Sequence, residues 1–164
     1  MPTSDDALIL KGTSSNAPDH EDTETLVIED GNALFHSLVS VPETFNMISK
    51  CILQRLPKNS NVLFSTDLYK KISTKQKERQ NRGQGPVHRI QGGKTRRPED
   101  WKLFLSNSSN KLRLGKILKE TWESDECAPY FHVRTVTIIC EDKPERSKAF
   151  QLSSRDGKKP RLKT

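Results

Sequence analysis

The sequence is short of apolar residues and contains no long hydrophobic run. Hydrophobic residues make up 32% of the 164 positions, against roughly 45–50% in an ordinary globular domain. We therefore expect one domain with unfolded segments around it. The absence of any stretch of about 18 apolar residues excludes a transmembrane helix and predicts no membrane partner. The acidic N-terminus also lacks the basic and apolar regions of a secretory signal.

Cysteine is scarce, and two easily recognised catalytic motifs are absent. The three cysteines, Cys51, Cys127 and Cys140, are widely spaced and odd in number. This argues against a disulfide framework and favours a reducing compartment, nuclear or cytoplasmic. Cys127, His132 and Cys140 lack the C-x-x-C or H-x-x-x-H spacing of a metal site, so core or surface positions are predicted. Neither G-x-x-x-x-G-K-[ST] nor G-x-S-x-G is present to support a P-loop or a serine hydrolase.

Charges of opposite sign are concentrated in separate segments. The net charge is +7, from 28 Lys+Arg and 21 Asp+Glu. Residues 1–30 carry eight acids and one base, residues 70–97 carry ten bases and one acid, and residues 143–164 carry eight bases and two acids. Two basic segments favour a polyanionic partner, most commonly nucleic acid. The alternative is a solvated surface followed by a disordered tail.

Three short β-branched runs predict the strands of a sheet. They occupy residues 25–29, 62–64 and 136–140, and each is followed by turn-forming or acidic residues. Helical segments separate them, so the strands are predicted to pair in parallel through right-handed crossovers. The expected fold class is therefore α/β, a partial three-layer sandwich with a small parallel sheet. Extra strands could come from 129–134 or from the segment near Phe150.

Helical periodicity accounts for the segments between the strands. Residues 33–39, a segment opened by Pro42 and a segment opened by Pro98 show helical spacing, and a longer helix follows a cap at Ser108 or Ser109. Trp101 and Trp122 are predicted to be core residues rather than platforms for stacked bases. The predicted buried faces comprise Phe45, Ile48, Ile52, Leu56, Trp101, Phe104, Leu105, Leu114, Ile117, Leu118, Thr121 and Trp122.

These patterns divide the chain into three parts. Residues 1–22 are predicted to be a disordered acidic leader, residues 23–142 the α/β domain, and residues 143–164 a disordered basic tail. Within the domain, residues 68–97 form a basic arm and loop. Five glycines and prolines within 82–97 predict that this part is exposed and flexible.

An acid follows each predicted strand. Asp30 and Asp67 follow the first two, and Asp142 follows the third, beside Glu141. The carboxyl ends of neighbouring parallel strands meet at one edge of a sheet, where ligands normally bind. Clustered carboxylates there favour Mg²⁺ or Mn²⁺, which could activate water and hold a phosphodiester for hydrolysis. The alternative is that these acids are common turn formers.

The segments around the first two acids resemble a known nuclease superfamily. Residues 26–34, L-V-I-E-D-G-N-A-L, are similar to the I-D-G-x-x-L strand and turn of PIN-like, flap-endonuclease-type 5′ nucleases. Residues 62–69, V-L-F-S-T-D-L-Y, are similar to the second acidic strand of these nucleases, V-F-D-x-Y. A closer resemblance, over about residues 24–142, is to uncharacterised animal proteins often linked to mobile elements. Their patterns D-x-Y-x-x-x-S-x-K-x-x-E-R-x-x-R-G and F-L-S-N-x-x-N-K are matched by residues 67–83 and 104–111.

This resemblance implies a PIN-like fold and makes Asp30 and Asp67 catalytic, metal-ligand positions for Mg²⁺ or Mn²⁺. Asp142 is added as a metal ligand from the strand pattern. The superfamily also carries a later acidic cluster of the type E-E-A-D-T, which this chain lacks, so the chain looks like the N-terminal portion of such a domain. The predicted function is nucleic-acid binding by a catalytically incomplete PIN-like domain. The alternatives are a Mg²⁺-dependent structure-specific nuclease and a non-enzymatic protein-interaction fragment.

The basic segment supplies the candidate contacts to nucleic acid. In the resemblance, residues 70–82 take the place of a basic arch that handles single-stranded nucleic acid. Cations contact phosphates with little sequence preference, so a single-stranded or flap-like nucleic acid is the expected partner. A basic cluster at 158–163 is of the nuclear-targeting kind. Tyr69 is a candidate for stacking on a base, and the alternative is a tyrosine that packs against a helix. The other candidate binding residues are Lys70, Lys71, Lys75, Lys77, Arg79, Arg82, Arg89, Lys94, Arg96 and Arg97.

Overall fold

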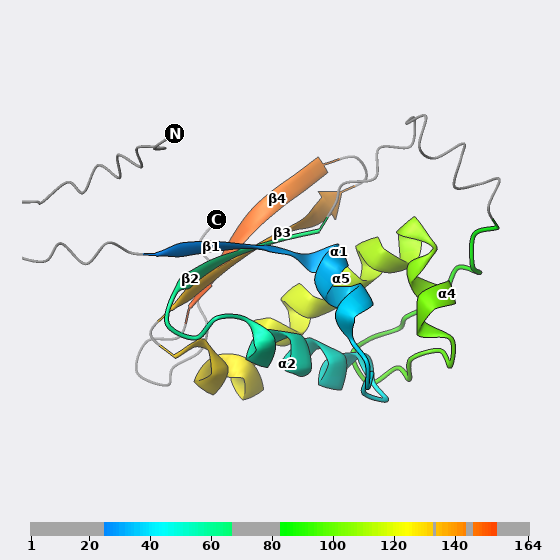
Figure 1. Ribbon diagram of the computed structural model, residues 1–164, viewed down its shortest axis with the longest axis horizontal. Helices are drawn as coiled ribbons and strands as arrows, with labels where there is room; N and C mark the ends of the chain where they lie inside the picture. Colours follow the sequence, from blue (N-terminus) through cyan, green and yellow to red (C-terminus); the bar gives the residue numbers. More distant parts are fainter. Residues whose placement is uncertain (1–24, 67–82, 133, 144–145, 154–164) are drawn as a thin grey trace, which may run out of the picture.

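A computed structural model describes residues 25–66, 83–132, 134–143 and 146–153 (Figure 1). Its described strands form one sheet in the order β1-β2-β3-β4. They are β1 (Leu26–Asp30), β2 (Asn61–Ser65), β3 (Thr135–Lys143) and β4 (Arg146–Ser153). β1 pairs with β2 and β2 with β3 in parallel, whereas β3 and β4 are antiparallel. The α/β class predicted from the sequence is confirmed.

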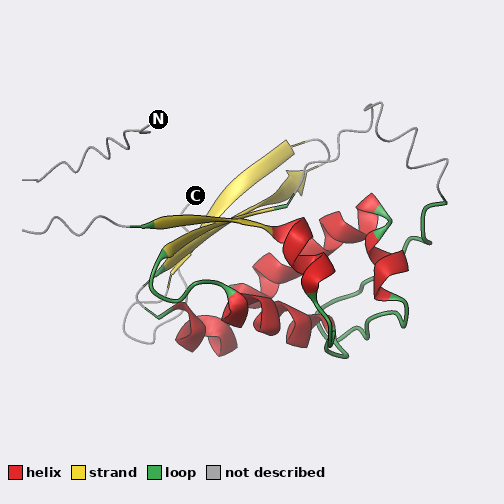
Figure 2. Cartoon of the chain, in the orientation of Figure 1, coloured by secondary structure: helices red, strands yellow, loops and turns green. Residues whose placement is uncertain are grey.

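The described helices lie on one side of this sheet (Figure 2). They are α1 (Gly31–Ser37), α2 (Phe45–Arg55), α4 (Trp101–Leu105), α5 (Ser108–Trp122) and the 3₁₀ helix η1 (Asp125–Phe131). The N-cap of α5 is Asn107 rather than Ser108 or Ser109, because the Asn107 side chain accepts a hydrogen bond from the Ser109 backbone N–H (2.9 Å). Within the described ranges the architecture has two layers instead of the predicted three.

The C-terminal part differs from the sequence prediction. β4 lies inside 143–164, the segment predicted to be a disordered tail. Buried Phe150 and Leu152 alternate with exposed Ala149 and Gln151 along β4, the pattern of a strand with one buried face. This short alternation is flanked by charged residues, which is why composition alone indicated a tail. A strand near Phe150 is thus confirmed, whereas the described part of 129–134 contains none.

The hydrophobic core lies between the sheet and the helices. Every residue of the predicted buried faces in α2, α4 and α5 is buried, whereas in the predicted helix 33–39 the helix ends at Ser37 and Val39 is 92% exposed. The indole N–H of Trp122 donates to the carbonyl of Ser49 (2.8 Å), and that of Trp101 donates to the carbonyl of Phe35 (3.0 Å). Because each indole has an internal acceptor, both large rings can be buried without losing a hydrogen bond. The prediction that both tryptophans are core residues is confirmed.

Arg134 is a buried cation that joins α2 to η1. Its guanidinium donates hydrogen bonds to the carbonyls of Leu53 (3.1 Å), Leu56 (2.9 Å) and Tyr130 (3.1 Å), and also to that of Pro57. Burial lowers the pKa of Arg134. The last carbonyls of a helix have no partner inside the helix, so Arg134 closes the C-terminal end of α2.

Strand β1, at one edge of the sheet, exposes two apolar side chains. Leu26 and Ile28 are 58% and 71% exposed.

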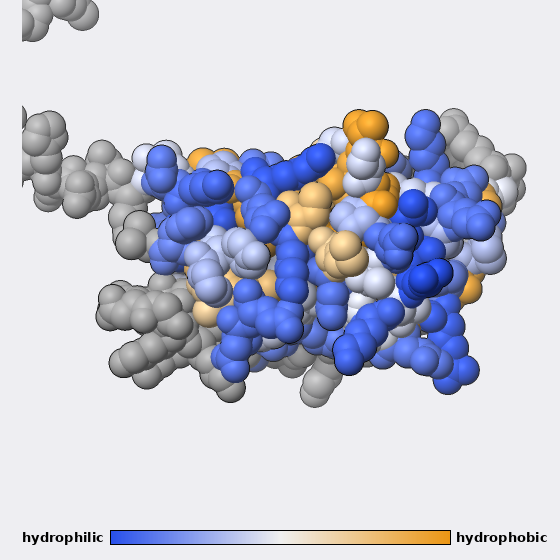
Figure 3. Space-filling model, turned by 90° about the horizontal axis from the view of Figure 1, so that it is seen from below, coloured by the Kyte–Doolittle hydropathy of each residue, from blue (hydrophilic) through white to orange (hydrophobic). Residues whose placement is uncertain are grey.

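Seen from the helix side, the surface is largely hydrophilic, with apolar residues in small patches (Figure 3). None of the helices in the described ranges has the length and apolar character needed to cross a bilayer.

Candidate nucleic-acid interface

The carboxyl ends of the parallel strands form one edge of the sheet. Asp30, the last residue of β1, is in register with Ser65 of β2, and Ser65 is in register with Ile139 of β3. Thr66 follows Ser65 and is buried, and its hydroxyl donates to the Ile139 carbonyl (3.3 Å). Asp30 therefore lies at the edge where ligands of such sheets normally bind.

Asp30 is also the N-cap of α1. Its Oδ1 accepts hydrogen bonds from the backbone N–H groups of Asn32 (2.9 Å) and Ala33 (3.2 Å), which have no acceptor within the helix. The adjacent Gly31 passes close to β2, because a Cβ there would lie 2.7 Å from Cζ of Phe64. The Asp-Gly pair thus has a structural role: it ends β1, starts α1 and allows the chain to turn over β2.

The described residues do not assemble the predicted metal site around Asp30. Asp67 lies outside them. β3 continues to Lys143, so Asp142 is three positions beyond Ile139, about 10 Å further along the strand. Among the described residues, no group of three or more His, Cys, Asp or Glu side chains is arranged to hold a metal. A metal site that includes Asp30, Asp67 and Asp142 remains a prediction.

Lys111 is a residue to which sequence analysis assigned no role. It lies in the first turn of α5 and is only 8% exposed, which is unusual for lysine. Partial burial lowers the pKa of His36 in α1, and the nearby charge of Lys111 lowers it further. Helical spacing is the sequence signal that could have predicted the burial of Lys111, because this residue is three positions before Leu114, which is on the predicted buried face.

Two buried asparagines fasten residues 85–88 to the start of α5. The side-chain N–H of Asn107 donates to the carbonyl of Gly85 (2.8 Å). Asn110 accepts a hydrogen bond from the backbone N–H of His88 (2.7 Å) and donates to the carbonyl of Pro86 (3.0 Å). Both asparagines belong to the segment 104–111 that matches F-L-S-N-x-x-N-K. In the structure, the role of these two motif positions is to hold residues 85–88 against the start of α5.

The other end of the loop is fastened to α2. The backbone N–H groups of Phe45 and Asn46 donate to the carbonyls of Thr95 (3.2 Å) and Gly93 (2.7 Å). Ile90, midway along the loop, is 6% exposed. The backbone of residues 83–97 is therefore fastened at both ends, which differs from the predicted flexible loop, whereas the predicted exposure holds for most of its residues. Glycine and proline content predicts turns, but it does not reveal which backbone groups find partners on distant helices.

The loop presents most of its basic side chains to solvent. Arg89, Lys94 and Arg96 are exposed. Arg97 is different: its Nε donates to the carbonyl of Val41 (3.1 Å), and Nη1 donates to two further backbone carbonyls. Three of the four predicted basic contacts in the loop are thus available to a ligand, whereas Arg97 mainly holds the connection between α1 and α2.

The remaining candidate contacts lie outside the described residues. They are Tyr69, Lys70, Lys71, Lys75, Lys77, Arg79 and Arg82, together with the basic cluster at 158–163. The described interface therefore consists of the ordered loop and the surfaces next to it.

Comparison with known proteins adds no relative. No family model, curated protein or solved structure matches the chain. The functional assignment therefore depends on the residues described above.

Proposed function

We propose that this chain binds single-stranded or flap-like nucleic acid through its basic loop, as a PIN-like domain with an incomplete catalytic centre. The observation that carries the proposal is the loop itself, which exposes Arg89, Lys94 and Arg96 from a backbone fastened to α2 and α5. A fixed backbone loses less entropy on binding than a mobile one, so it presents these cations to phosphates at lower cost. The net charge of +7 adds long-range attraction.

Two observations support the PIN-like part of the proposal. β1, β2 and β3 are parallel neighbours, and Asp30 lies at the carboxyl end of β1. The incomplete centre is supported by the chemistry of Asp30, whose described hydrogen bonds cap α1. Metal-dependent hydrolysis with two ions needs several well-placed acids, and within the described ranges no three His, Cys, Asp or Glu side chains are grouped to hold a metal.

The test compares two variants that lose equal charge. Lys94→Gln/Arg96→Gln removes two loop cations, whereas Arg55→Gln/Lys58→Gln removes two exposed cations at the far end of α2. Arg55 is nine residues from Asn46, about 14 Å along the helix. Fluorescence anisotropy with labelled single-stranded and flap DNA and RNA, across a salt series, measures binding by both variants and by the unmodified chain.

The loop variant is expected to bind about tenfold more weakly at low salt. Its plot of log K against log[salt] should be shallower by about 1.4–1.8, because two phosphate contacts are lost. The control variant should retain most of the affinity. Equal weakening by both variants, or no binding by the unmodified chain, would contradict the proposal. Metal-dependent cleavage in the same samples, lost in Asp30→Ser, would favour the nuclease alternative.

A further inference from the structure

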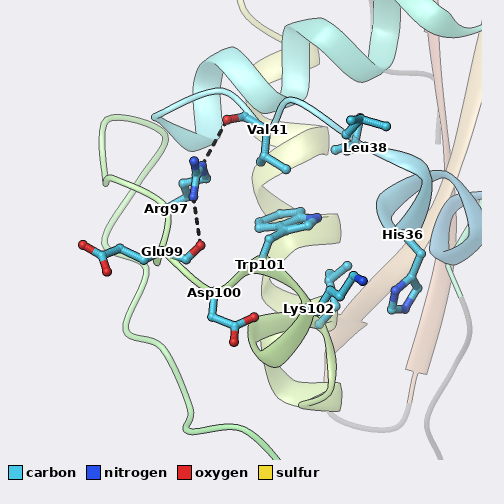
Figure 4. A pocket seen from close by; sticks show the side chains of 10 residues that line it. His36, Leu38, Val41, Arg97, Glu99, Asp100, Trp101 and Lys102 are labelled. Atoms are coloured by element: carbon cyan, nitrogen blue, oxygen red, sulfur yellow. Dashed lines mark hydrogen bonds between the residues drawn. The ribbon is translucent and has the colours of Figure 1, made fainter.

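Two large apolar side chains are exposed together on one edge of the sheet, Leu26 (58%) and Ile28 (71%) of β1. The cavity of about 520 Å³ in Figure 4 offers less to a ligand, since Trp101 and Leu105 in its lining are only 7% and 1% exposed. We propose that the outer edge of β1 pairs with the same edge of a second copy of this chain, in an antiparallel, two-fold dimer. This interface is separate from the basic loop and does not rest on the proposed function.

The backbone of β1 directs hydrogen-bonding groups outward. β1 is the first strand in the sheet order, so within the described ranges no strand pairs with its outer edge. The Thr25 carbonyl accepts a hydrogen bond from the Asn61 backbone N–H (3.0 Å) and so points toward β2. Backbone direction alternates along a strand, so the N–H and C=O groups of Leu26 and Ile28 point away from β2. Such a row of groups is a template for another strand.

The opposite edge of the sheet is less suited to pairing. Strand β4 carries Lys148, whose Nζ lies 5.6 Å from the centroid of the Phe150 ring. Lysine on an edge strand is a common protection against pairing with another chain. The sequence of β1, L-V-I-E-D, contains no Lys, Arg or Pro and has an apolar centre. β1 is therefore the edge at which a second chain is expected.

Side-chain chemistry selects one register for the two copies. An antiparallel pair centred on Val27 places Leu26 of each copy opposite Ile28 of the other, so two apolar pairs form. A pair centred on Ile28 would place Leu26 opposite Asp30, and an in-register parallel pair would bring the two Glu29 side chains together. Centring on Val27 also leaves the acids of the two copies at opposite ends of the junction. The edge is thus complementary to itself in this one register.

The same register satisfies the outward backbone groups. Leu26 of one copy and Ile28 of the other form a hydrogen-bonded pair and exchange two N–H···O=C bonds, and the two-fold axis repeats this pair. All the outward N–H and C=O groups of these two residues then have a partner.

The dimer also extends an apolar row across the face of the sheet that the described helices leave uncovered (Figure 2). Phe64 is buried on the helix side, so its neighbour Leu63 and the residue in register with Leu63, Ile28, lie on the other side. In the dimer, Leu26 of the second copy continues this row. Parallel strands are normally covered on both faces, so a longer apolar row here reduces the exposure of this face.

The first experiment measures self-association of the full chain. Sedimentation velocity over a concentration series compares the unmodified chain with Ile28→Lys and Val87→Lys. Val87, in the basic loop, is the matched control, because it is 70% exposed and the charge change is the same. The unmodified chain and Val87→Lys are expected to form a reversible dimer. Ile28→Lys should raise the dissociation constant of the dimer at least about tenfold, since a two-fold interface contains each substitution twice.

A cross-linking experiment tests the register. The two Val27 residues at the centre of the junction form a non-hydrogen-bonded pair with Cα atoms about 4.5 Å apart, which is within the range for a disulfide. Val27→Cys should therefore give a covalent dimer when the thiol oxidant diamide is added, as seen on a non-reducing gel. Val87→Cys should not. Both variants retain Cys51, Cys127 and Cys140, so the unmodified chain gives the background.

Three results would overturn the inference. A monomer at every concentration would mean that another part of the chain or a different partner covers β1. Equal dissociation constants for Ile28→Lys and Val87→Lys would place the dimer interface elsewhere, and continued growth beyond a dimer would exclude a closed two-fold assembly. None of these results depends on nucleic-acid binding by the loop, so the proposed function is tested separately.

Discussion

The backbone N–H of Asn46 donates a 2.7 Å hydrogen bond to the carbonyl of Gly93, and the Asn46 side chain occupies the space that a Cβ on Gly93 would need. Oδ1 of Asn46 also accepts a hydrogen bond from the hydroxyl of Thr121 (3.1 Å). Asn46 therefore connects the basic loop to both α2 and α5. The position of the exposed loop cations therefore depends on Gly93, because a Cβ at this position would overlap the Asn46 side chain.

Gly93→Ala is expected to weaken nucleic-acid binding several-fold without changing the net charge. The new methyl group overlaps the Asn46 side chain, which must move and lose its bond to Thr121, at a cost of about 1–2 kcal/mol. Gly92→Ala is the matched control, because no atom lies within 4 Å of a Cβ built there. Anisotropy and urea denaturation measure both effects, and equal behaviour of the two variants would show that the loop position does not matter.

Gly31→Ala and Gly115→Ala should change stability in opposite directions. A Cβ on Gly31 would lie 2.7 Å from Cζ of Phe64, so overpacking should destabilise the fold by about 1–3 kcal/mol. At Gly115, inside α5, the nearest atom would be Oγ1 of Thr66 at 3.5 Å. Alanine fits there and should stabilise the helix by about 0.5–1 kcal/mol. Urea denaturation gives both values, and a loss of stability in Gly115→Ala would contradict this packing.

Substitutions at Asp30 separate helix capping from metal chemistry. Asp30→Ala removes the acceptor for two backbone N–H groups and should cost about 1 kcal/mol of unfolding free energy. Asp30→Ser keeps an N-cap oxygen and should recover most of that loss, although it has no carboxylate. Thermal unfolding distinguishes the two variants. The same loss in both would mean that the cap contributes little to the stability of α1.

Arg134→Met should be the most destabilising of these substitutions. Methionine fills a similar volume but leaves the carbonyls of Leu53, Leu56, Pro57 and Tyr130 without their donor, so about 3 kcal/mol or more should be lost. Arg134→Lys places all donors on a single nitrogen, so it should restore only part of the lost unfolding free energy. Exposed Arg55→Met is the control in urea denaturation, and a loss below about 1 kcal/mol in Arg134→Met would contradict the role assigned to Arg134.

Stability is expected to fall below about pH 6.5, in part through His36. The pKa of His36 is lowered in the fold, so at pH values below its ordinary pKa the unfolded chain binds a proton that the folded chain does not. Burial is the main cause of this lowering, and the charge of Lys111 in α5 adds to it. His36→Asn should therefore show a smaller fall in melting temperature between pH 7 and pH 5. An identical fall in the variant would rule out this contribution.

The helices and strands follow from local signals. Apolar spacing in 45–56 and 114–122 predicts helix faces that are buried, and the β-branched runs predict β1, β2 and β3. These predictions succeed because periodicity and turn chemistry act between residues that are close in the chain. β4 was harder to predict because its alternation of Phe150 and Leu152 with polar neighbours lies within a basic segment.

The sequence by itself determined the α/β class, the buried helix faces and the basic character of the loop. Only the tertiary structure decided which polar residues serve the fold and which remain available to a ligand. Arg134 and Arg97 bond to carbonyls from distant segments, Leu53 and Val41 among them, whereas Lys94 and Arg96 remain exposed. Identical residue types therefore have different roles, because the fate of a charge depends on the acceptors that folding brings to it from elsewhere in the chain.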